Sequence, residues 1–277
     1  MAEEKSPYQE EEDTQRKIEE AIIAILALAL VSSVQDLDED FSPQDLEGSL
    51  DTYLNKSSEV IPILSSFIPT AIKLGIDRFK ELSSYSINMA DSTFTTIASE
   101  IFNENFSYIQ SVNREALALL QSERLTRNWS NKEFIRRVKT YFGLTSTQIS
   151  QILAYEDSLV SQIKPKLDKD TIKARIQTKV DRLLNWRLKL ISTRLSVSLV
   201  EESKLASWIY LEDSYQLELG SYGKQWVSVI DDVTTETCIN TNMEIVPLRS
   251  PFSNGVYTPP AINPLHPCRS SIRLVKL

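Results

Sequence analysis

Glycine and proline are scarce in this chain and unevenly placed, and no other feature constrains its fold as strongly. Six glycines and 11 prolines occur among 277 residues, about half of the usual share. Sandwiches and barrels need a turn about every 8–12 residues, so this composition excludes them and favours long helices. Neither residue occurs between Pro165 and Gly220, whereas six prolines lie beyond residue 219. The sequence predicts a mainly α fold with an elongated helical body and a small α+β C-terminal module.

The order of segments predicts three parts: an acidic arm with an apolar helix (1–40), a helical body (41–219) and a C-terminal module (220–277). Residues 1–13 are expected to be loose. We expect helices over about 14–34, 43–54, 60–82 with an interruption near Pro69, 88–121, 130–142 and 145–163. Three starts carry capping patterns, namely Ser42 before Pro43, Ser130 with Glu133, and Thr145 with Gln148.

The longest periodic run follows Asp168 and predicts one helix of more than forty residues, to about Leu211. Its apolar row recurs at spacings of three and four: Ile172, Ile176, Val180, Leu183, Trp186, Leu190, Arg194, Val197 and Val200. Basic side chains are expected on the opposite face: Lys173, Arg175, Lys179, Arg182, Arg187 and Lys189. This face could meet DNA phosphates without reading sequence. It could equally be a solvated helix face.

The formal charge of −8 argues against nucleic-acid binding only when the chain is taken as a whole. Residues 1–50 carry a net charge of −11, whereas residues 121–195 carry +9. This asymmetry predicts an ionic partner, or contact between the acidic and basic segments.

An unbroken apolar run over 21–31 is the strongest membrane signal in the sequence. As a helix it spans only about 16 Å, against about 30 Å for a bilayer core. We therefore expect no membrane-spanning segment, and expect this helix to be buried or to lie in an oligomer interface. The acidic first residues are not typical of a secretory signal.

The turn-rich C-terminal part contains three strand patterns, over 225–230, 244–246 and 271–275. It also contains both cysteines, Cys238 and Cys268, and the single histidine, His266. These three side chains are candidate zinc ligands, with Asp231, Asp232 or Glu244 as a fourth. The cysteines could instead be packed thiols or form a disulfide. A thiol hydrolase and a metal-dependent nuclease are weaker alternatives, because no oxyanion loop or phosphate-binding glycine loop is recognisable.

The last fifty residues contain an ordered motif: Trp226, Asp231, Thr234 and Cys238, followed by His266, Cys268 and Arg269. This motif resembles the C-terminal domain of the tailed-phage minor head, or head morphogenesis, proteins, the Mu F-like family. Two positions depart from the family pattern. Its Leu-Asp-Gly turn is Thr241-Asn242-Met243 here, so Asn242 or another non-glycine residue must form the turn. One residue rather than two separates His266 from Cys268.

The resemblance implies a non-enzymatic structural protein of the virion. It would lie inside the capsid at the portal vertex, in multiple copies, after assembly in the host cytoplasm. The implied partners are the portal protein, other head proteins and packaged DNA, and the implied roles are head assembly, DNA packaging or DNA delivery. Two alternatives remain: an internal virion protein ejected with the DNA, and a metal-dependent hydrolase carried by the C-terminal module.

Overall fold

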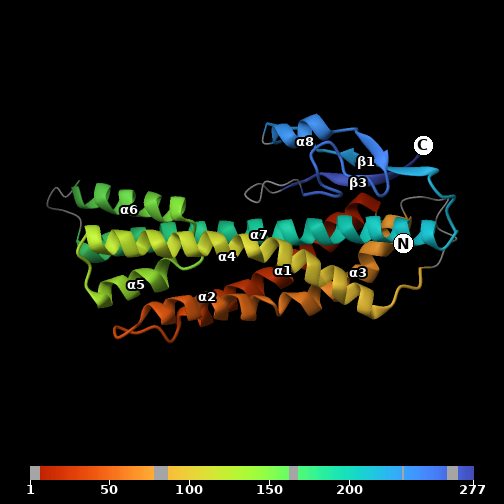
Figure 1. Ribbon diagram of the computed structural model, residues 1–277. Helices are drawn as coiled ribbons and strands as arrows, with labels where there is room; N and C mark the ends of the chain where they lie inside the picture. The colour runs from red at the N-terminus through yellow and green to blue at the C-terminus, as the bar shows by residue number, and fades with distance from the viewer. Residues whose placement is uncertain (1–6, 78–86, 162–167, 233, 261–267) are drawn as a thin grey trace, which may run out of the picture. The chain divides into compact units, whose positions relative to one another are not determined.

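The computed structural model describes residues 7–77, 87–161, 168–232, 234–260 and 268–277. The prediction of a mainly α protein with long helices and a small C-terminal sheet is confirmed (Figure 1). The helices are α1 (Pro7–Val34), α2 (Pro43–Ser57), α3 (Val60–Asp77), α4 (Asp91–Thr126), α5 (Asn131–Tyr141), α6 (Ser146–Ser161), α7 (Lys169–Asp213) and α8 (Glu236–Thr241). The strands are β1 (Tyr222–Val227), β2 (Ile245–Pro247) and β3 (Ser271–Lys276).

The chain packs into two compact units that do not follow chain order. Unit 1 contains residues 1–22, 60–103 and 190–277, and unit 2 contains residues 23–59 and 104–189. Helices α1, α4 and α7 contribute residues to both units. The three consecutive segments predicted from the sequence describe how composition and charge change along the chain.

Side-chain caps set the helix starts that the sequence predicted. Ser42 and Asp45 form a reciprocal capping box at α2, and Ser130 accepts a hydrogen bond from the backbone of Glu133 at α5. Thr145 and Gln148 cap each other's backbone N–H groups at 3.0 and 3.1 Å. Each cap satisfies N–H groups that have no partner within the helix.

Three predicted boundaries were wrong. Helix α1 begins at Pro7, within the stretch expected to be loose, and Pro69 lies inside α3 without ending it. Helix α4 continues to Thr126, five residues past the predicted end. The helical turns on either side, together with tertiary packing, keep these segments helical where local sequence signals favour a break. Tertiary contacts outweigh local propensity here. The predicted ends near 82 and 163 lie outside the described residues.

Large side chains form the core of each unit. In unit 1, Trp208 is fully buried and its indole N–H donates to the carbonyl of Gly75 at 3.1 Å. A Cβ at Gly75 would approach Lys204 Cγ to 2.9 Å, so the missing side chain allows α3 and α7 to pack closely. In unit 2, buried Tyr53 meets the ring of Phe142 edge-on, with centroids 5.9 Å apart.

The sheet is antiparallel, with β1 in the centre and β2 and β3 at its edges. Strand β1 ends at Val227, so the predicted strand through Ile230 was too long. The turn before β2 places Met243, and not Asn242, at a positive φ of 67°.

One helical stretch of the described residues, Pro43–Ile76, is long and apolar enough to cross a membrane by length and composition alone. It contains α2, α3 and the turn between them, and 44% of its apolar window is buried inside the protein. Buried core helices meet the same criteria, so this is a weak signal. It lies outside the apolar run at 21–31 that the sequence had singled out.

Candidate functional site

Two residues of the motif, Trp226 and Cys238, are joined by a hydrogen-bond network beside β1. The buried indole of Trp226 donates to Ser228 Oγ at 2.9 Å, and Ser228 Oγ donates to the Cys238 carbonyl at 2.9 Å. The hydroxyl oxygens of Ser228 and Ser270 lie 3.0 Å apart. The network therefore joins β1, α8 and the segment before β3.

The two cysteines meet inside this network. Cys238 and Cys268 are each 3% exposed and are both free thiols. A hydrogen bond with Cys238, together with burial, raises the pKa of Cys268, while hydrogen bonds from Ser270 oppose the rise. His266, the third candidate zinc ligand, lies outside the described residues. The zinc prediction therefore remains a prediction, and no disulfide joins the two cysteines in this structure.

An ion pair and a tight turn join the other motif positions. Arg269 pairs with the carboxylate of Asp231, and the Thr234 hydroxyl donates to the Val229 carbonyl at 2.7 Å. Asp231 N–H donates in turn to Thr234 Oγ1 at 2.9 Å. These bonds fix the loop that enters α8 against the segment that enters β3.

The remaining candidate ligands do not join the cysteines. Asp232 is exposed, and the Glu244 carboxylate accepts hydrogen bonds from Ser253 N–H and Ser253 Oγ at 2.9 and 2.7 Å. No three His, Cys, Asp or Glu side chains gather as a metal site within the described parts of the chain.

A buried ionic cluster, which the sequence analysis missed, attaches β3 to α7. Glu201 and Lys204 are fully buried, with Glu201 Oε1 2.6 Å from Lys204 Nζ. Lys204 Nζ also donates to Ser271 Oγ at 2.9 Å and lies 3.4 Å from Glu11 of α1. Burial raises the pKa of Glu201, and the charge of Lys204 opposes that rise. An acid and a base three residues apart are common on exposed helices, so the spacing gave no signal of burial.

A second buried cation lies in β1. Lys224 Nζ donates to the Leu248 carbonyl at 2.8 Å and lies 5.4 and 5.0 Å from the ring centroids of Phe252 and Tyr257. Burial lowers the pKa of Lys224 to about 8. The aromatic rings partly compensate the buried charge.

The predicted basic face of α7 divides in the structure. Lys173, Arg175, Arg182 and Lys189 are exposed and Lys179 is half-buried, but Arg187 is only 5% exposed. Among the residues that the structure describes, Arg187 makes one hydrogen bond, of 3.4 Å, to Asn113 Oδ1. Its neighbour Trp186, assigned to the apolar row, is 51% exposed. The two assignments at 186 and 187 were therefore wrong, because the buried side of this long helix does not follow a single straight row.

Two arginines elsewhere in unit 2 each bind both oxygens of an acidic side chain. Arg137 binds both oxygens of Glu156 at 2.7 and 2.8 Å, and Arg127 binds both oxygens of Asp157 at 2.7 and 2.8 Å. Within the same unit, Glu39 of the acidic segment lies 3.2 Å from Lys132. These three pairs compensate part of the positive charge of residues 121–195, whereas Arg175 and Arg182 of α7 make no such pair with the residues that the structure describes.

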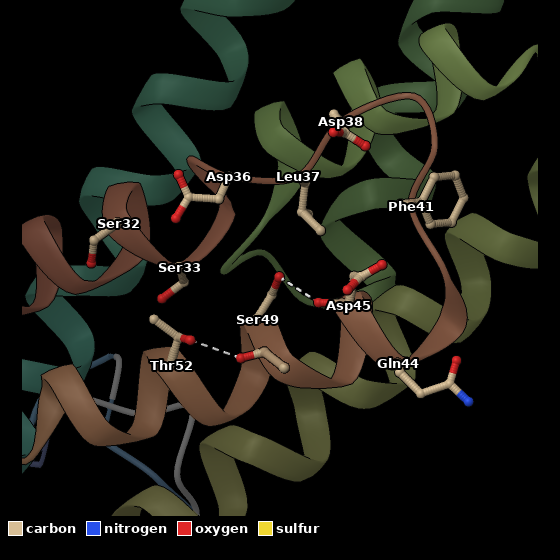
Figure 2. Close-up of a pocket in the computed structure, with 11 residues that line it drawn as sticks. Ser32, Ser33, Asp36, Leu37, Asp38, Phe41, Gln44, Asp45, Ser49 and Thr52 are labelled. Carbon is tan, nitrogen blue, oxygen red and sulfur yellow. Dashed lines mark hydrogen bonds between the residues drawn. The ribbon is translucent and has the colours of Figure 1, made fainter.

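A polar pocket of about 380 Å³ lies between the end of α1 and α2, in unit 2 (Figure 2). Asp36, Asp38 and Asp45 give it an acidic lining. Asp45 accepts hydrogen bonds from Ser42 as part of the α2 cap, and Asp38 accepts one from the backbone of Asp40. The Ser49 hydroxyl donates to the carbonyl of Asp45. Because Asp38, Asp45 and Ser49 already serve a helix end or a turn, the pocket does not define a ligand site.

Comparison with protein-family models, curated proteins and solved structures finds no match to this chain.

Proposed function

We propose that this chain is a structural virion protein of a tailed phage, acting as a minor capsid or head-morphogenesis protein at the portal vertex. The role would lie in head assembly, DNA packaging or DNA delivery. One observation carries the proposal. Trp226 and Cys238 are linked through Ser228, and Arg269 pairs with Asp231 in the same small module. Motif residues that contact one another within one folded module are expected to have a structural role.

The side chains of the motif also favour a structural rather than a catalytic role. The Asp231 carboxylate is paired with Arg269, and both thiols are buried in contact with each other. Groups engaged in this way stabilise a fold more readily than they transfer protons or attack substrates.

Locating the chain in intact particles tests the proposal. We expect quantitative mass spectrometry to find a few copies per head, and antibody-labelled cryo-electron microscopy to place them at the portal vertex. Arg269→Gln should reduce incorporation, because it breaks the pair with Asp231, whereas Lys276→Gln at an exposed position of β3 should not. Absence from particles, or even distribution over the shell, would contradict the proposal.

A second candidate, ejection of the chain with the DNA, is favoured by one feature of α1. Leu28 and Val31, one helical turn apart, are 71% and 68% exposed and could enter a membrane surface. Loss of the chain from emptied heads, together with flotation on liposomes, would support ejection. Retention in emptied heads supports the portal role.

A further inference from the structure

A stripe of four cations and one tryptophan runs along α7, within unit 2. Its members are Arg175, Lys179, Arg182, Trp186 and Lys189, separated alternately by four and three residues. At 100° per residue this spacing keeps all five within a sector of about 80°. Lys173 lies about 160° around the helix from Arg175, outside the stripe. The stripe spans about 21 Å of the helix axis.

The charges of Arg175 and Arg182, two of the four cations of this stripe, are not neutralised by the residues that the structure describes. Arg175 and Arg182 make no hydrogen bond or ion pair with any other residue that the structure describes. Lys179 reaches the Gln151 carbonyl at 3.3 Å and the Tyr155 ring at 4.5 Å, both on α6. The two acids near the end of α6, Glu156 and Asp157, are already held by Arg137 and Arg127. The stripe therefore favours a polyanion.

Trp186 indicates which polyanion fits. Its side chain is 51% exposed, whereas Trp208 and Trp226 are fully buried and Trp129 is half-buried beneath Arg137. An exposed indole within a row of cations is the arrangement with which proteins bind single-stranded nucleic acid. Cations follow the phosphates, and a base stacks on the ring. In a duplex the base faces are already stacked, so only phosphate contacts remain.

We propose that the α7 stripe binds single-stranded nucleic acid without sequence preference, through phosphate contacts and stacking of a base on Trp186. The inference deepens the DNA contact within the proposed function. The test uses purified full-length chain, so its outcome is independent of where the chain lies in a particle. At about 3.4 Å per phosphate along one strand, the stripe matches about six nucleotides.

The experiment measures binding of a fluorescein-labelled twenty-nucleotide thymidylate strand and of a duplex of equal length, as a function of salt. We expect Trp186→Ala to weaken single-strand binding between about fivefold and 150-fold, as for loss of one stacked base, and to change duplex binding little. Arg175→Gln with Arg182→Gln should weaken both, and should lower the salt slope for the single strand by about 1.4. Lys173→Gln is the matched control and should change neither.

Three results would overturn the proposal. They are equal effects of Trp186→Ala on single strand and duplex, an effect of Lys173→Gln as large as that of the stripe variants, and binding to anionic vesicles without binding to the oligonucleotide. All substituted side chains are exposed or half-exposed, so unchanged thermal melting of each variant shows that a loss of binding is not a loss of fold.

Discussion

The carboxylate of Glu201 accepts a hydrogen bond of 2.7 Å from the backbone N–H of Ile272. A buried acid of α7 thereby holds the start of β3, and Lys204 supplies the balancing charge at 2.6 Å. Neither side chain can lose its partner without leaving a charge or a backbone group unsatisfied in the interior.

This relationship predicts strong energetic coupling between Glu201 and Lys204. Glu201→Ala should lower the free energy of unfolding by about 3–5 kcal/mol, because Lys204 loses its nearest acid and Ile272 N–H its acceptor. In a double-mutant cycle by chemical denaturation, Glu201→Gln with Lys204→Met should cost clearly less than the two single changes together. Additivity within about 0.5 kcal/mol would show that the pair does not act as a unit.

Lys224 predicts a stability gain in mild alkali. Its pKa is about 8 in the folded protein and near the ordinary 10.5 in the unfolded chain. Between these values the unfolded chain holds one more proton, so the free energy of unfolding rises with pH, by at most about 1.4 kcal/mol per pH unit.

Subtracting the pH profile of Lys224→Met from that of the unchanged protein isolates this contribution, since other groups titrate in both. The difference should be flat below about pH 7 and should rise from about pH 8 to 10. A difference that stays flat throughout would mean that the lysine keeps its ordinary pKa.

Arg187 and Arg137 should respond oppositely to replacement by methionine. Arg187 is buried with one long hydrogen bond, and burial lowers its pKa. Arg187→Met should therefore leave stability unchanged or raise it. Arg137→Met should cost about 3–5 kcal/mol, because buried Arg137 binds Glu133 and Glu156. Denaturation midpoints measure both, and a loss above about 2 kcal/mol for Arg187→Met would reveal an anionic partner.

Met243 predicts a stabilising substitution at the turn before β2. Its φ of 67° is unfavourable for a residue with a side chain, and the side chain is 54% exposed. Met243→Gly should raise the free energy of unfolding by about 0.5–1 kcal/mol, because glycine adopts a positive φ without strain. Asn242→Gly should do the reverse, because Asn242 Oδ1 accepts the Ser228 N–H at 2.9 Å. Thermal melting of both variants gives the comparison.

Zinc is one of the alternatives predicted for the two cysteines, beside packed thiols and a disulfide. If zinc is bound, elemental analysis should find about one zinc per purified chain. Chelation, Cys238→Ser or His266→Ala should each remove the metal and lower the melting temperature. A metal-free chain whose melting is insensitive to chelator would identify the cysteines as packed thiols.

Features that depend on residues close together in the sequence were predicted well, and features that depend on residues far apart in the sequence were not. Helix caps such as Ser42 with Asp45 are local, so their residue types alone reveal them. Which side chains of α7 are buried depends on the other parts of the chain that pack against this helix. Residues 195–201 of this helix are all buried, and the intermingled serines Ser196 and Ser198 carry no apolar signal, so the row through Val197 and Val200 marks only part of the buried side.

The candidate site was also predicted only in part, because the residues that join the motif positions are distant in the sequence. The motif positions were recognised from their order along the chain, but the acceptors that join them, such as Ser228 and Ser270, carry no signature. Buried Lys224 and Glu201 were missed because charge in a sequence normally signals exposure. Only the tertiary arrangement provides the carbonyl and the counter-charge that allow their burial.

The position of β1 at the centre of the sheet has a consequence for biosynthesis. Its neighbour β3 is translated 44 residues after β1 ends, which at 5–20 residues per second takes about 2–9 s. Once β1 has left the ribosome, and until β3 has emerged as well, one edge of β1 is unpaired and can join a strand of another chain. Closure of this module therefore depends on the pace of the ribosome, and slow codons between the two strands would favour aggregation without altering a single residue.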